Sequence, residues 1–116
     1  MNEFIDHLRD VFRLFGPFAA KRMFSGYGLF RDGLMYGLVV RDTLYLKADA
    51  KSAPKFTKLG LPPFEYQRKG KVARLSYYTA PESVMEDAAE ASRWARLAFE
   101  AALRANAAKA KSKRKS

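Results

Sequence analysis

The residue types that most often carry enzyme chemistry are scarce in this chain of 116 residues. Cysteine is absent, and His7 is the only histidine. These counts exclude a disulfide, a thiolate metal site, a cysteine nucleophile and a metal site built on several histidines. His7 lies on the polar side of a predicted helix, where a surface position is the usual role. The sequence therefore predicts no catalytic residue, no metal site and no cofactor.

Four carboxylates gather near the predicted start of a later helix: Glu82, Glu86, Asp87 and Glu90. Their spacing matches no acid–base or metal signature. Acidic side chains at a helix start interact favourably with the helix dipole. We therefore interpret this group as a helix start and predict that the protein is not an enzyme.

The glycine-rich segment Gly26-Tyr27-Gly28 could bring the backbone close to a phosphate group. The dinucleotide-binding fingerprint needs a third glycine and a helix after it. Here Arg31 stands at the third position, and another predicted strand follows. We interpret the two glycines as a strand bulge or a close backbone approach.

Basic residues offer a different chemistry, namely contacts with nucleic-acid phosphates. The net charge is +10, and residues 101–116 hold six of the 22 basic residues and none of the 12 acidic ones, so residues 1–100 carry only +4. Such a tail can bind phosphates in a salt-dependent manner or serve as a solubilising end. Tyrosines in the predicted strands can likewise stack on bases or simply fill strand positions. The candidate nucleic-acid contacts are Arg22, Arg68, Lys69, Lys71, Arg74, Lys113, Arg114 and Lys115.

A mixture of helices and strands must position these residues. An apolar stripe at helical spacing predicts a first helix that ends at Gly16-Pro17. Three strands follow, separated by tight turns at Asp32-Gly33 and Arg41-Asp42. The strand segments are Tyr27–Arg31, Leu34–Val40 and Thr43–Lys47. In the third strand, Leu44 and Leu46 should face one side and Tyr45 and Lys47 the other.

The second half of the chain repeats this mixture of elements. A helix is predicted over residues 48–59, two strands over 64–68 and 71–78, and a long helix from Asp87 to about Ala107. Strands grouped in hairpins indicate an α+β fold, with a five-stranded antiparallel sheet covered by helices on one face, in the order α-β-β-β-α-β-β-α. We expect one domain over residues 1–107 and a disordered basic tail over 108–116.

Neither a membrane span nor an export signal is predicted. No apolar run approaches the roughly 18–20 residues that a transmembrane helix needs. The first residues are acidic, whereas a signal peptide begins with basic ones. We therefore expect a cytoplasmic protein.

Several short motifs together resemble the N-terminal domain of the TfoX/Sxy competence regulators over roughly residues 3–104. They are Arg22-Met23-Phe24-Ser25-Gly26-Tyr27-Gly28-Leu29-Phe30, Asp32-Gly33, Leu44-Tyr45-Leu46-Lys47, Phe64 with Tyr66, Lys69-Gly70-Lys71, Ser76-Tyr77-Tyr78, Pro81-Glu82 and Trp94-Ala95-Arg96. The resemblance implies an α+β domain with a five-stranded antiparallel sheet. It also implies a part in switching on genes for natural transformation, together with a DNA-bound activator.

The same resemblance implies no catalytic residues, because the family is not known for enzymes. It marks seven signature positions to which no role is assigned: Arg22, Met23, Phe24, Gly26, Gly28, Tyr45 and Lys47. Full-length regulators of the family have a second, C-terminal helical domain, so we expect a stand-alone copy of the N-terminal domain here.

Two functional hypotheses follow. The first is a non-enzymatic regulatory or adaptor domain that contacts a protein, such as a DNA-bound transcription activator. Its contact surface would be the sheet face away from the helices, or the strand at residues 22–24. The alternative is direct, sequence-independent binding of nucleic acid by the basic residues. Exposed strand edges also favour a homodimer.

Overall fold

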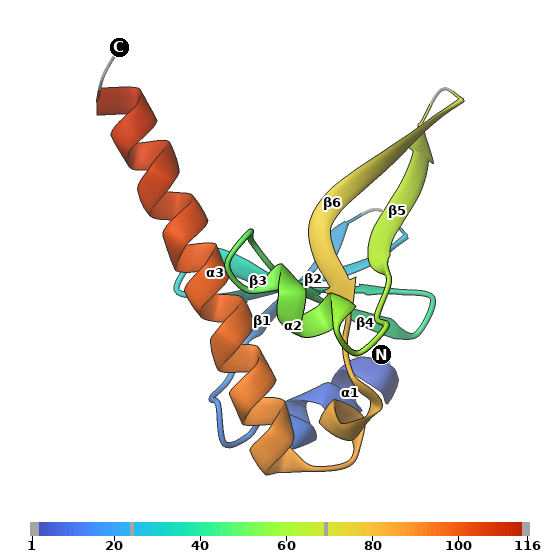
Figure 1. The fold of residues 1–116 in the computed structure, drawn as a ribbon. Helices are drawn as coiled ribbons and strands as arrows, with labels where there is room; N and C mark the ends of the chain where they lie inside the picture. The colour runs from blue at the N-terminus through green and yellow to red at the C-terminus, as the bar shows by residue number, and fades with distance from the viewer. Residues whose placement is uncertain (1–2, 24, 69, 115–116) are drawn as a thin grey trace.

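A computed structural model of the chain describes residues 3–23, 25–68 and 70–114, with side chains for all of these except 67–68, 71–75 and 111–114. Helices and strands alternate in groups along it (Figure 1). In chain order they are α1 (Glu3–Val11), β1 (Ala19–Met23), β2 (Gly26–Arg31), β3 (Leu34–Val40), β4 (Thr43–Lys47), α2 (Ala53–Thr57), β5 (Pro63–Arg68), β6 (Lys71–Thr79), the 3-10 helix η1 (Glu82–Met85) and α3 (Ala88–Arg114).

The strands form one antiparallel sheet in the order β1-β2-β3-β4-β6-β5. The α+β class is confirmed, but the predicted number of five strands is wrong. The sixth strand is β1, which pairs with β2 from Ala19 opposite Phe30 to Met23 opposite Gly26. Apart from Met23, its residues are small or basic and mostly exposed, as is common in edge strands, so they lack the apolar alternation that marks a strand in a sequence.

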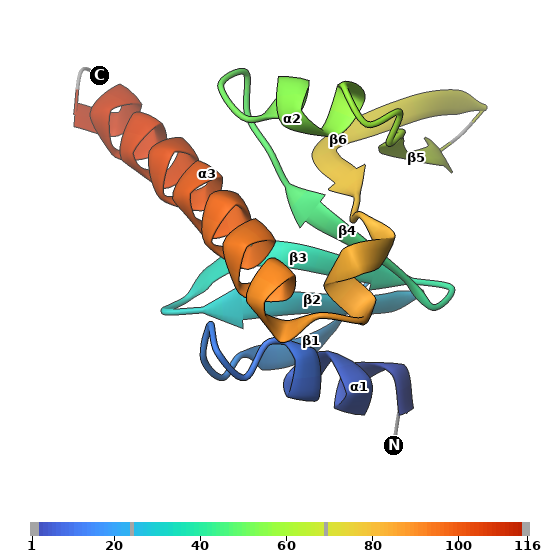
Figure 2. The same cartoon turned by 60° about the horizontal axis from the view of Figure 1, so that its bottom comes forward.

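The helices gather on one face of the sheet, as predicted. Helix α3 crosses β3 and β4, while α1 and η1 contact one another beside it (Figure 2). The main core lies between this layer and the sheet. Its fully buried side chains include Phe12, Leu29, Tyr36, Leu46, Phe56 and Val84.

A bulge in β3 helps to fill this core. The register of β2 and β3 shifts between Leu29 and Phe30: Leu29 is opposite Gly37, whereas Phe30 is opposite Met35. Tyr36 is therefore the extra residue, and its side chain enters the core. A Cβ at Gly37 would lie 3.1 Å from the Leu29 side chain, so the glycine makes room for that leucine.

Helix α3 is longer than the sequence indicated. We predicted its end near Ala107 and a disordered segment over 108–116, but the helix continues to Arg114 and projects beyond the sheet (Figure 1). Alanines at 105, 107, 108 and 110 favour a helix, and basic residues near its C-terminus interact favourably with the dipole.

Candidate functional site

The sheet face opposite the helices, here called the outer face, carries a second and smaller apolar cluster. Within the described part of the chain, the hydrophobic members of this cluster all come from strands, although the C-terminal half of α3 passes beside Met35 and Tyr77. Its buried members are Leu38, Val40, Phe64 and Tyr77, and its partly exposed members are Met23, Met35, Tyr45 and Tyr66. Five of the six strands contribute to it, namely β1, β3, β4, β5 and β6.

The alternation along β4 separates the two faces. Leu44 and Leu46 are buried in the main core, whereas Tyr45 belongs to the outer cluster. Lys47 lies with its ammonium 5.2 Å from the ring centroid of Tyr77, which is also on the outer face. The predicted separation of these four side chains is confirmed.

The outer face buries side chains because the sheet curls. The Tyr45 and Phe64 rings lie 4.8 Å apart although β6 separates their strands. The Tyr77 hydroxyl donates a hydrogen bond of 3.2 Å to the Met35 carbonyl, reaching past β4. Burial raises the pKa of the Tyr77 hydroxyl above its usual range, which keeps this donor protonated. Figure 1 shows the β5–β6 hairpin rising steeply from the other strands.

The two glycines of the Gly26-Tyr27-Gly28 segment are explained by tight packing. A Cβ at Gly26 would lie 1.7 Å from the Val39 carbonyl oxygen. A Cβ at Gly28 would lie 2.6 Å from Met23 Sδ and 2.9 Å from both Met35 Sδ and a Phe30 ring carbon. Gly28 thus leaves the space in which three outer-face side chains meet. The following segment is part of a strand, which agrees with the interpretation of the segment as backbone packing.

Cations lie on the outer face as well. The Lys21 ammonium is 4.9 Å from the Phe30 ring centroid, and Lys47 makes the corresponding contact with Tyr77. Such contacts hold an ammonium near an aromatic face at about 0.5–1 kcal/mol when exposed. The outer face therefore combines aromatic rings and thioethers with positive charge.

The structure brings some of the signature positions together. Met23, Tyr45 and Lys47 share the outer face, with Gly28 beneath Met23. Arg22 is exposed on the edge strand β1, and Gly26 packs against β3. Phe24 lies outside the described residues.

The described candidates for nucleic-acid contact belong to separate elements. Arg68, Lys71 and Arg74 belong to the β5–β6 hairpin, while Lys113 and Arg114 belong to the end of α3. These two elements project at separate places (Figures 1 and 2). The side chains of these five residues, like the whole of Lys69 and Lys115, lie outside the described part of the structure.

The acidic group and His7 take part in local structure. Asp87 accepts a hydrogen bond of 2.8 Å from the Ala89 N–H, which confirms it as the cap of α3. Glu90 forms an ion pair of 2.9 Å with Arg93. His7 Nε2 lies 2.8 Å from the Met85 carbonyl oxygen, to which it can donate. Among the described residues, no three His, Asp or Glu side chains are grouped so that they could hold a metal ion.

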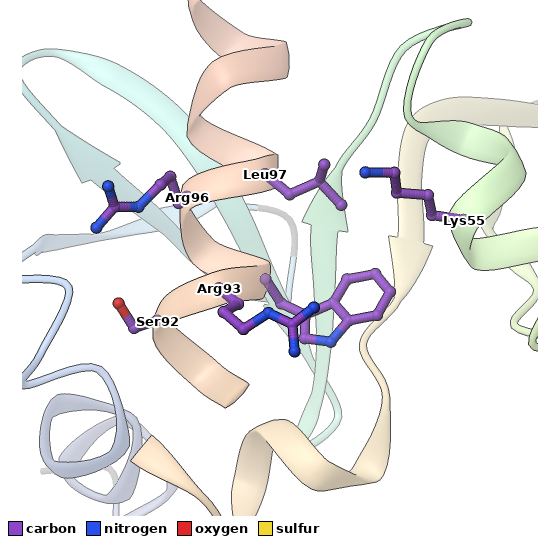
Figure 3. A pocket seen from close by; sticks show the side chains of 6 residues that line it. Lys55, Ser92, Arg93, Arg96 and Leu97 are labelled. Atoms are coloured by element: carbon purple, nitrogen blue, oxygen red, sulfur yellow. The ribbon is translucent and has the colours of Figure 1, made fainter. Parts of the chain in front are cut away.

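A surface pocket of about 340 Å³ beside Trp94, which the sequence did not indicate, involves α2 and α3. Leu97 points towards Lys55 of α2, whereas Ser92 and Arg96 point to the opposite side of α3 (Figure 3). Trp94 packs on Phe56 with ring centroids 5.1 Å apart. The polar groups therefore do not converge, and Trp94 has a clear role in packing.

The described helices also include none with the length and apolar character that crossing a bilayer requires. This finding agrees with the hydropathy of the sequence.

Residues 10–102 match the TfoX N-terminal domain family. The chain is 29% identical over 103 residues to the DNA transformation protein TfoX1 of Aliivibrio fischeri, an alignment that covers 77% of this chain and 49% of the relative. It is 35% identical over 81 residues to the DNA transformation protein TfoX of Haemophilus influenzae, and this alignment covers 68% of this chain and 37% of the relative. The chain thus spans less than half the length of these two curated relatives.

Proposed function

Because the chain belongs to the family of TfoX N-terminal domains, we propose that it is a regulatory domain that binds a protein partner through its outer face. The names of its relatives refer to DNA transformation, so a competence-related regulatory role is the family's contribution to this proposal. We propose a DNA-bound transcription activator as the partner.

The observation that carries the proposal is the composition of the outer face. Methionine and tyrosine are enriched in protein interfaces, and methionine adapts its shape to different surfaces. Met23, Met35, Tyr45 and Tyr66 remain partly exposed there, at the rim of a small buried cluster. Lys21 and Lys47 add positive charge. We expect the partner to present apolar side chains flanked by carboxylates.

An in-cell crosslinking experiment tests this contact. A photoreactive phenylalanine analogue at Tyr45 should form one discrete adduct with a protein in the native host. The same analogue at Leu14, which is 62% exposed and lies next to α1, should form none. Equal crosslinking from both positions would contradict a specific outer face.

A genetic experiment tests whether the contact matters for regulation. The double variant Met23→Ser, Met35→Ser should fail to restore transformation frequency in a deletion strain while remaining folded. The matched double variant Leu14→Ser, Leu59→Ser removes apolar side chains that are exposed elsewhere, and should restore it. Full restoration by the outer-face variant would overturn the proposal.

Direct nucleic-acid binding is the second candidate function. It is favoured by the continuation of α3 as a helix that carries Lys109, Lys111, Lys113 and Arg114. Binding to duplex and single-stranded DNA should then weaken steeply between two salt concentrations, and the slope should decrease when residues 108–116 are removed. An absence of binding at low salt would exclude this function.

A further inference from the structure

A hollow of about 240 Å³ lies where the C-terminal half of α3 passes the start of β3 and the end of β4. Its polar lining comes from Lys47 of β4, Tyr77 of β6, and Asn106 and Lys109 of α3. Of the described residues that line it, none is acidic. The hollow therefore has two ammonium groups and an amide but no carboxylate.

The nearest relevant carboxylate is already engaged. Asp49 receives two hydrogen bonds from Arg104, at 2.5 Å and 3.0 Å. Its other contacts are with Ser52 and the Lys51 N–H. Asp49 is therefore a poor counterion for the ammonium groups of the hollow, although its charge still acts on Lys47.

The two lysines repel each other. Burial lowers the pKa of Lys47, the positive charge of Lys109 lowers it further, and Asp49 opposes both effects. Like charges near a common hollow are unfavourable when no anion lies between them. An anion in the hollow would remove this repulsion and would interact with both ammonium groups.

We propose that the hollow binds a small oxyanion of the phosphate class between Lys47 and Lys109, with the Asn106 amide as a further donor. Its volume is below the roughly 300–1,000 Å³ of pockets for drug-sized ligands, which favours a small ion over an organic cofactor. The Tyr77 hydroxyl is engaged with the Met35 carbonyl, so Tyr77 contributes its ring as a wall. Lys47 is shared with the proposed protein contact, but phosphate binding is measured on the isolated chain, so its failure would leave that contact untouched.

NMR of the lysine side chains in the full chain tests the proposal. Inorganic phosphate is titrated at pH 7 with the ionic strength held constant by sodium chloride. The signals of Lys47 and Lys109 should shift in a saturable manner. Lys47→Met and Lys109→Met each keep an unbranched side chain and remove the charge, and each should weaken binding at least tenfold. Lys55→Met, at the separate Trp94 pocket, should bind as the unaltered protein does.

A pH titration of the Lys47 NMR signal distinguishes phosphate binding by Lys47 from a purely structural role of this lysine. The charged groups that act on Lys47 are Lys109 and Asp49, the latter paired with Arg104. Bound phosphate should raise the pKa of Lys47 towards its usual value. A thermal melt of each variant without phosphate confirms that it is folded.

A short single-stranded oligonucleotide provides the second arm, because its backbone is another source of phosphate groups. If the oligonucleotide and inorganic phosphate compete for binding, and if this competition is lost in Lys47→Met and Lys109→Met, the two ligands share one site. The proposal is overturned if inorganic phosphate shows no saturation, if both variants bind it as tightly as the unaltered protein, or if only the oligonucleotide binds.

Discussion

The two faces of the sheet bury apolar side chains by different means. On the inner face, the helices supply fully buried residues such as Leu8, Phe56 and Val84, and the turn after α1 supplies Phe12. On the outer face, the curl of the sheet buries a smaller cluster around Leu38 and leaves the methionine and tyrosine rim partly exposed. The first arrangement serves mainly stability. The second leaves adaptable side chains available for contact.

The largest expected effect is on the inner face. Phe12→Ala should reduce the free energy of unfolding by about 3–5 kcal/mol, because the ring is fully buried and contacts Phe18 and Tyr36. Met23→Ala on the outer face should cost about 1 kcal/mol or less, since Met23 is partly exposed. Urea unfolding of both variants measures the difference. Similar losses would show that the outer cluster stabilises the fold as strongly as the main core.

Gly26 and Gly28 of β2 allow a finer comparison, between packing against the backbone and packing in the outer cluster. Gly26→Ala should cost about 2–3 kcal/mol, because its Cβ would meet the backbone of Val39. Gly28→Ala should cost about 1 kcal/mol, because two of its three nearest neighbours are the flexible ends of Met23 and Met35. Chemical denaturation compares the two, and a larger cost at Gly28 would mean that the outer cluster is packed rigidly.

Short sequence patterns were sufficient to predict much of the fold. The Asp32-Gly33 and Arg41-Asp42 turns are present, with positive φ at all four residues. The alternation along β4 gave the correct faces. Strand β1 was anticipated only as a segment at residues 22–24 and was not counted as a separate strand, because its exposed small and basic residues before Met23 have no apolar period. Helix α3 is longer than predicted because its last turns, which have no apolar residue larger than alanine, still have the high helix propensity of their alanines.

The sites were only partly predictable. The family resemblance marked Met23, Gly28, Tyr45 and Lys47 as signature positions, but it did not indicate the curl of the sheet that brings outer-face residues from distant strands together. The approach of Lys109 to Lys47 depends on where α3 crosses the sheet. Such a crossing is decided by tertiary packing, which no local sequence pattern contains.

A smaller loss of stability than at Phe12 or Gly26 is expected at Asp49, whose side chain links the start of α2 to α3. Its carboxylate accepts hydrogen bonds from the Ser52 N–H at 3.0 Å and from Arg104. Asp49→Asn should cost no more than about 1 kcal/mol at pH 7, because solvent screens an ion pair whose side chains are 25% and 39% exposed.

The pH dependence of the stability difference tests whether the negative charge of Asp49 causes it. The hydrogen bond from Arg104 holds the pKa of Asp49 well below its usual range in the folded state. The stabilisation is therefore complete above the unfolded pKa of about 3.9 and is lost as the pH falls below it. Urea unfolding from pH 7 to pH 2 should show the gap between the unaltered protein and Asp49→Asn narrowing below about pH 4. A constant gap would assign the effect to packing.

The smallest predicted changes in the free energy of unfolding have opposite signs on the two faces of the sheet. Tyr36 is fully buried among the rings of Phe12, Phe15 and Phe99, and its hydroxyl has no hydrogen-bond partner among the described residues. Tyr36→Phe should therefore stabilise the protein by about 0.5–1 kcal/mol, since it removes an unpaired polar group.

Tyr77→Phe is the matched change on the outer face. It should destabilise by about 1 kcal/mol, because it removes the hydrogen bond to the Met35 carbonyl that ties β6 across β4 to β3. Thermal and urea unfolding of the two variants give the signs directly. Destabilisation by both changes would mean that Tyr36 also has a partner, and that polar contacts hold the inner face as they hold the outer one.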